Sequence, residues 1–108
     1  MENQTVNEGK TIAIISYITF IGNIVAFIMN SSKKNSFASF HIRQMIGLLL
    51  LSIINKYLIY DFLGSMAGWI VGVLLFVLWV IGFLGAIQGE EKRVPLLGDY
   101  FQDWFKNI

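Results

Sequence analysis

Three long runs of apolar residues occupy most of this 108-residue chain and constrain its fold more than any other feature. They cover Thr11–Met29, Phe37–Tyr60 and Phe62–Ile87, and the first and third contain no charged side chain. A water-soluble domain of this size buries only about two thirds of its surface, so it could not hide this much apolar material. The sequence therefore predicts an all-α integral membrane protein that forms a single membrane domain.

Each apolar run has about the length of a transmembrane helix. At about 1.5 Å per residue, 19 residues cover roughly 28 Å, close to the thickness of the hydrocarbon core. We expect three transmembrane helices and a short amphipathic helix at the membrane interface. The expected spans are about 11–29, 38–60 and 63–88, and the interfacial helix is about 99–108.

The basic residues are divided unevenly between the two sides that three spans would define. The side of the amino terminus and the second loop holds Lys10 and Lys56. The side of the first loop and the carboxyl tail holds Lys33, Lys34, Arg43, Lys92, Arg93 and Lys106. Since cytoplasmic segments are enriched in Lys and Arg, this distribution predicts an external amino terminus and a cytoplasmic carboxyl terminus.

Small residues recur at helical spacing in two of the predicted spans. Gly64, Gly68 and Gly72 lie four residues apart, and Gly22 with Ala26 forms a matching notch on the first span. Such stripes allow helix backbones to approach closely in a membrane. They predict either packing between the helices of one chain or a seam between copies in a homo-oligomer.

A cluster of aromatic and polar residues opens the second span. It comprises Phe37, Phe40, His41, Arg43 and Gln44. Helical spacing puts His41 and Gln44 on one face and turns Arg43 elsewhere. His41 could relay a proton or bind an anionic lipid headgroup with the nearby lysines. The alternative is an interfacial histidine that bonds to a neighbouring helix or to the backbone.

The carboxyl tail has an aromatic face. Gly89 and Pro95 end the third span, and Asp99 can cap a new turn. The apolar residues that follow include Tyr100, Phe101, Trp104 and Phe105. Their spacing predicts a short helix that lies on the inner membrane surface, either as an anchor or as a docking element for a larger complex.

The chain offers few groups for chemistry. It has no cysteine, one histidine, seven carboxylates and a net charge of +1. It contains no glycine-rich phosphate loop, zinc-binding histidine motif or serine elbow. We therefore expect no enzyme activity, no catalytic residues, no cofactor, no metal site and no nucleic-acid partner.

Two of these segments resemble a known family. Phe37-x-x-Phe40-His41-x-x-Gln44, with Gly89-Glu90 and Val94-Pro95-Leu96, is similar to the Tic-twenty family of chloroplast import components and its small bacterial relatives. The resemblance covers about Thr11 to Leu97. It implies a bacterial cytoplasmic membrane and supplies no catalytic residues. The chloroplast members have four predicted spans, so the resemblance does not carry a protein-conducting role over to this chain.

Three functional hypotheses follow. The first is an accessory or stabilising subunit of a larger membrane assembly, whose partners are lipids and another membrane protein. The second is a homo-oligomeric pore or import-like conduit, which the glycine stripe and the resemblance suggest. The third is a lipid- or pH-sensing module that uses His41.

Overall fold

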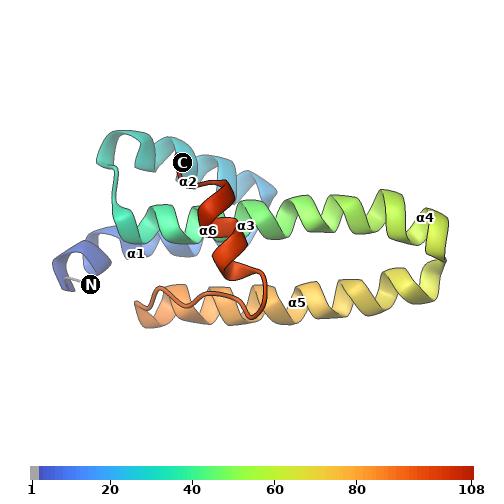
Figure 1. Cartoon of the computed structure of the whole chain (residues 1–108). Helices are drawn as coiled ribbons and strands as arrows, with labels where there is room; N and C mark the ends of the chain where they lie inside the picture. The colour runs from blue at the N-terminus through green and yellow to red at the C-terminus, as the bar shows by residue number, and fades with distance from the viewer. Residues whose placement is uncertain (1–2) are drawn as a thin grey trace.

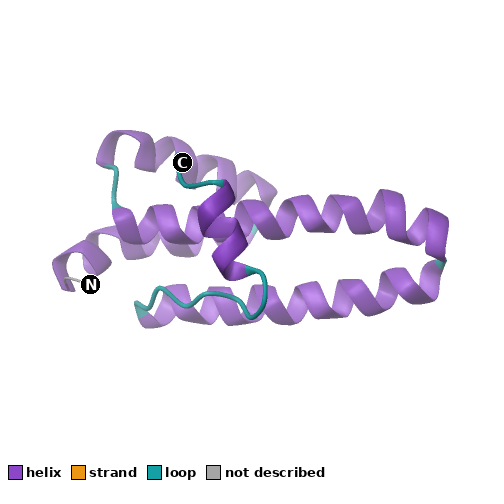
Figure 2. Cartoon of the chain, viewed as in Figure 1, coloured by secondary structure: helices purple, strands orange, loops and turns teal. Residues whose placement is uncertain are grey.

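A computed structural model describes residues 3–108, and this part of the chain contains helices and loops but no strand (Figures 1 and 2). The elements are α1 (Asn3–Ile18), α2 (Phe20–Lys33), α3 (Ser36–Ile54), the π-helix η1 (Asn55–Ile59), α4 (Tyr60–Leu63), α5 (Ser65–Gln88) and α6 (Gly98–Trp104). The prediction of an all-α fold is confirmed.

A long antiparallel helical hairpin forms the axis of the molecule. α3, η1 and α4 join into one helix, Ser36–Leu63, and α5 returns beside it (Figure 1). Gly64 makes the turn with φ +97°, a conformation that disfavours residues with a Cβ. At 28 and 24 residues, the two helices reach about 42 and 36 Å, so both are long and apolar enough to cross a membrane.

The predicted first span is wrong, because Thr11–Met29 folds as two helices with a break at Thr19. Thr19 is extended (φ −158°, ψ 176°), and its hydroxyl accepts a 3.0 Å hydrogen bond from the Gly22 amide. This is an N-cap, which starts a new helix. A Cβ at Gly22 would overlap the Ile15 carbonyl oxygen, so glycine allows α2 to fold back on α1. The structure thus has two candidate spans instead of three.

The α1–α2 hairpin packs beside only the first part of α3 (Figure 1). The Asn35 amide donates to the Thr5 carbonyl at 2.9 Å, so α1 starts beside the start of α3. α2 returns to the same end, where the Asn30 amide donates to the Ser39 hydroxyl at 2.8 Å. The start of α1 therefore lies beside the first loop. The orientation derived from three spans, which separates these segments across a membrane, loses its basis.

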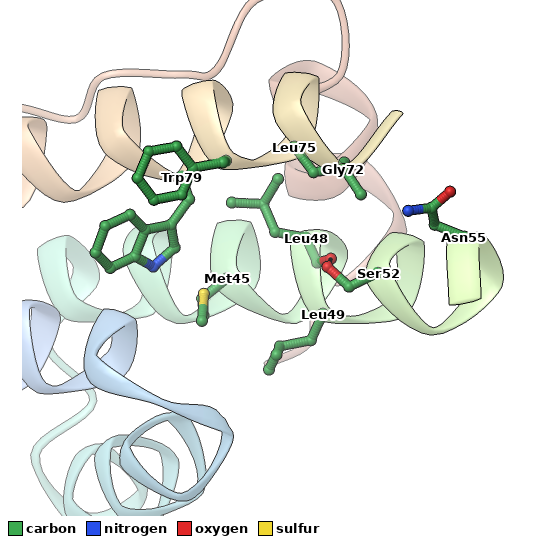
Figure 3. Close-up of a pocket in the computed structure, with 9 residues that line it drawn as sticks. Met45, Leu48, Leu49, Ser52, Asn55, Gly72, Leu75 and Trp79 are labelled. Carbon is green, nitrogen blue, oxygen red and sulfur yellow. Dashed lines mark hydrogen bonds between the residues drawn. The ribbon is translucent and has the colours of Figure 1, made fainter. Parts of the chain in front are cut away.

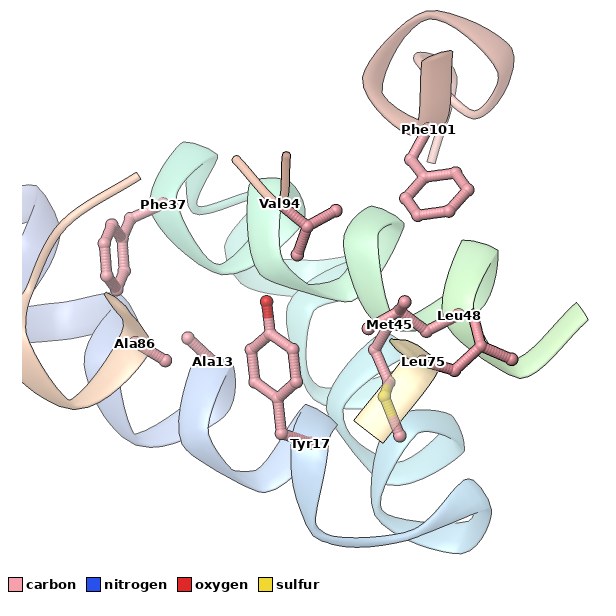
Figure 4. Packing of buried hydrophobic residues seen from close by; sticks show 9 residues of the cluster. All are labelled: Ala13, Tyr17, Phe37, Met45, Leu48, Leu75, Ala86, Val94 and Phe101. Atoms are coloured by element: carbon pink, nitrogen blue, oxygen red, sulfur yellow. The ribbon is translucent and has the colours of Figure 1, made fainter. Parts of the chain in front are cut away.

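The main core lies where α1, α3, α5 and the carboxyl tail meet (Figure 4). α6 lies across α3, and its Phe101 is only 1% exposed. A Cβ at Gly47 would overlap the Phe101 ring, so Gly47 provides the notch that receives it. Of the other aromatic residues predicted for the interfacial helix, Tyr100 and Trp104 are exposed and Phe105 is half-buried.

Candidate functional site

Three buried polar side chains form a hydrogen-bonded network between α1 and α3. The Tyr17 hydroxyl lies 2.6 Å from His41 Nδ1 and accepts from Gln44 Nε2 at 2.9 Å. His41 and Gln44 thus share a face of α3 that is turned toward α1. All three side chains are fully buried.

The backbone that follows α5 completes this network. His41 Nε2 lies 2.8 Å from the Glu90 carbonyl oxygen, which can only accept, so Nε2 donates. Gln44 Nε2 also donates to the Lys92 carbonyl at 3.0 Å, and Gln44 Oε1 accepts from the Val94 amide at 2.9 Å. In a neutral imidazole with the proton on Nε2, Nδ1 accepts a hydrogen bond that the Tyr17 hydroxyl donates. The network therefore ties α1, α3 and the tail together with a neutral imidazole.

Phe37 and Phe40 shield this histidine. Their ring centroids lie 4.8 and 4.9 Å from that of His41, and both contacts are edge-on. Aromatic rings on both sides exclude water and fix the orientation of the imidazole. The observed hydrogen bonds of His41 are therefore with a neighbouring helix and with the backbone.

Arg43 points away from the network toward the carboxyl tail. Its Nη2 donates to the Lys106 carbonyl at 3.0 Å, and its Nη1 makes a long 3.5 Å contact with Gln102 Oε1. Gln102 Nε2 donates to the Phe40 carbonyl at 2.9 Å, which adds a second tie between α6 and α3. Arg43 Nε is buried and has no hydrogen-bond partner within residues 3–108.

The small-residue stripes pack mainly within the chain. A Cβ at Gly68 would overlap the Tyr60 ring, whereas a Cβ at Gly72 would meet only Asn55 Nδ2, at 3.6 Å. Gly64 lies at the turn, with open space around it. Ala26 is fully buried, and Gly22 contacts α1. The stripe that suggested a homo-oligomer is therefore occupied at Gly68 by a residue of the same chain.

An open groove, which the sequence analysis missed, lies between α3 and α5 beyond the α1–α2 hairpin (Figure 3). Its volume is about 280 Å³, and Trp79 and Asn55 lie at opposite ends of it. Its other lining residues are Met45, Leu48, Leu49, Ser52, Gly72, Leu75 and Phe76. We call it the α3–α5 groove.

Asn55 is the notable polar residue of this groove. It is only 6% exposed, and its Nδ2 donates to the Gly68 carbonyl at 3.0 Å. Its Oδ1 is buried without a partner in the described part of the chain. η1 begins at Asn55, and π-helical turns are frequent at functional sites. An amide inside an apolar run is the sequence signal that marks this residue.

Comparison with known proteins identifies the family. Residues 8–101 match the profile described as the magnetosome magnetite crystal formation protein family. The chain belongs to this family. Within residues 3–108, no three His, Asp or Glu side chains gather as they would to hold a metal ion.

Two archaeal proteins from Methanocaldococcus jannaschii are also similar. UPF0132 membrane protein MJ1443 is 33% identical over 76 residues, which cover 67% of this chain and 66% of that protein. UPF0132 membrane protein MJ1527 is 22% identical over 100 residues, or 88% of this chain and 69% of that protein. The matches thus span about two thirds of the length of these relatives. No solved structure matches the chain.

These matches overturn the resemblance to the Tic-twenty family, because the chain belongs to another family of membrane proteins. The residues that carried the resemblance have a local role here. Gln44 binds the backbone around Val94, and His41 binds that of Glu90. A contact that ties a tail to a helix does not distinguish an import component from other small membrane proteins. The family does confirm that the chain is a membrane protein.

Proposed function

We propose that this protein is a non-enzymatic membrane component that packs against another membrane protein as an accessory or stabilising subunit. The α3–α5 groove, with the unpaired Asn55 Oδ1, carries the proposal. An unpaired carbonyl oxygen is costly in a membrane, and lipid tails offer no donor. Oδ1 is enclosed in the isolated chain, so rotation of the Asn55 side chain toward the groove would bring it within reach of a donor on a neighbouring helix.

The exposed surface around the groove also supports this proposal. Only 17% of the most apolar stretch of α5 is buried, against 56% for the most apolar stretch of Ser36–Leu63. Phe76 lines the groove, and Trp69, which is 67% exposed, lies on the same helix. Large aromatic side chains provide the contact area that a packed helix needs. At the α4 end, the molecule is a single layer of two helices, α3 and α5, that a partner can cover.

A homo-oligomeric pore or conduit has less support, since Tyr60 already covers Gly68. An accessory role also accommodates the description of the family, which concerns magnetite crystal formation. An accessory role requires no catalysis from this chain.

We further propose an orientation in which α1–α2 is a re-entrant hairpin. The amino terminus, the first loop and the carboxyl tail then share the cytoplasmic side, and α4 faces the opposite side. Seven of the eight basic residues belong to segments near the proposed cytoplasmic side, and Lys56 alone lies toward α4. This distribution fits the positive-inside rule better than the three-span arrangement does.

Extraction in mild detergent tests the accessory role. We expect the native protein to migrate in an assembly with a second membrane protein that mass spectrometry identifies. Gly72→Leu should release it, because a Cβ at this position meets only Asn55 Nδ2, at 3.6 Å, and the larger side chain would occupy the groove that Gly72 lines. Ile70→Phe, on the exposed surface of α5, is the control and should leave the assembly intact. A native protein that runs only as a monomer or small homo-oligomer would refute the proposal.

A further inference from the structure

We propose that a pocket at the tail-bearing end of the molecule binds the phosphate group of an anionic lipid. The pocket has a volume of about 370 Å³ and lies between the end of α2, the start of α3 and the residues after α6. Lys34, Arg43 and Lys106 line it, and each comes from a different segment of the chain. Its lining contains no Asp or Glu.

The backbone fixes two of these basic residues in place. Lys34 is the C-cap of α2 in the left-handed conformation (φ 50°), with its amide bonded to the Asn30 carbonyl at 2.7 Å. Helices commonly end on a residue in this conformation, which fixes the point where Lys34 leaves α2. Lys106 is held because its carbonyl accepts from Arg43 Nη2. Lys34 and Lys106 thus leave the backbone at fixed positions beside Arg43, and the lining contains no Asp or Glu.

Arg43 supplies the observation that points to an anionic ligand. Its Nε–H is buried and has no acceptor in the described chain. A buried N–H of a charged group is costly to leave unpaired, and an anion beside the guanidinium offsets this cost. Nε itself is enclosed, so a phosphate would contact the exposed Nη2 side of the group. Ser39 adds a second donor, because its Oγ accepts from the Asn30 amide and its own O–H can turn toward the pocket. Charge and hydrogen-bonding groups together fit a phosphate.

The surface beside the pocket favours a lipid as the source of this phosphate. Phe27 lines the pocket, and the exposed Ile24 and Ile28 continue an apolar face along α2. A headgroup bound by the basic residues could therefore lay its acyl chains along α2. Basic pockets at the cytoplasmic side of membrane helices bind anionic headgroups in this way. The same charges could also attract free inorganic phosphate, so the experiment must distinguish binding of the lipid from binding of the free ion.

Lipid binding by the full chain in nanodiscs tests the proposal. We expect phosphatidic acid, diluted in phosphatidylcholine, to bind the native protein preferentially. Lys34→Gln/Lys106→Gln should weaken this binding about tenfold. The control Lys33→Gln/Lys92→Gln removes the same charge outside the pocket lining and should retain the binding. Inorganic phosphate should compete only weakly.

Three outcomes would overturn the proposal. Equal losses in the two double variants would show general electrostatic attraction instead of a site. Absence of a preference for phosphatidic acid would show that the pocket does not bind an anionic lipid headgroup. Full competition by inorganic phosphate at equal concentration would show that the pocket binds the free ion instead of the lipid. Both double variants keep Arg43 and the buried network, so unfolding does not explain a difference between them.

Discussion

The buried Tyr–His–Gln network at one end of this molecule and the buried asparagine at the other end differ in their hydrogen bonding. At the tail-bearing end, α1, α2 and α6 wrap around α3, and Tyr17, His41 and Gln44 all have hydrogen-bond partners. At the α4 end, only two helices pair, and Asn55 keeps an unpaired oxygen beside an open groove. The comparison indicates that the first end determines the fold of the chain and the second is available to a partner.

Loss of the buried network should have the largest effect on stability. Gln44→Leu leaves the Lys92 carbonyl and the Val94 amide without their partner, and it removes one of the two partners of the Tyr17 hydroxyl, which keeps His41. Because each unpaired buried group costs about 1–3 kcal/mol, we expect a loss of about 3 kcal/mol in the free energy of unfolding in mixed micelles. Gln88→Leu, at an exposed position, is the control. A loss below about 1 kcal/mol for Gln44→Leu would contradict this role of the network.

A side chain at Gly68 should have the next largest effect. Gly68→Val would overlap the Tyr60 ring and should destabilise the α3–α5 hairpin by about 2 kcal/mol. Gly72→Ala, one turn away, meets no atom closer than 3.6 Å and should change stability little. Thermal unfolding of the two variants measures the difference. If both lost stability equally, the glycine stripe would not pack as described.

The helix break at Thr19 predicts a smaller loss. Thr19→Ala removes the hydroxyl that accepts from the Gly22 amide, which should cost about 1 kcal/mol. Thr19→Ser keeps the hydroxyl and should restore most of the stability. Chemical unfolding in detergent measures both variants. Unchanged stability in Thr19→Ala would show that the cap does not stabilise the break.

The groove should contribute least to the stability of the isolated chain. Asn55→Leu removes one hydrogen bond to Gly68, but it also removes the unpaired Oδ1. These effects oppose each other, so we expect a change below about 1 kcal/mol. The same variant should weaken association with the partner. A loss as large as that of Gln44→Leu would place Asn55 among the residues that determine the fold.

The sequence predicts the membrane environment and the helical fold because both depend on composition and helical period. It also places His41 and Gln44 on one helix face. It does not predict the break at Thr19, since hydropathy describes a run of residues and not the cap inside it. The partners Tyr17 and Val94 are far from Gln44 in sequence, so only the folded chain brings them together. The unpaired oxygen of Asn55 likewise depends on tertiary contacts.

The central claim is that α1 and α2 enter and leave on one side, next to the carboxyl tail. The chain has no native cysteine, so single substitutions can be labelled without background. Gln4→Cys and Asn107→Cys should react with an impermeant maleimide from the cytoplasmic side, and Asp61→Cys should react only from the opposite side. Reaction of Gln4→Cys from the same side as Asp61→Cys would contradict the re-entrant hairpin and restore a span through Thr19.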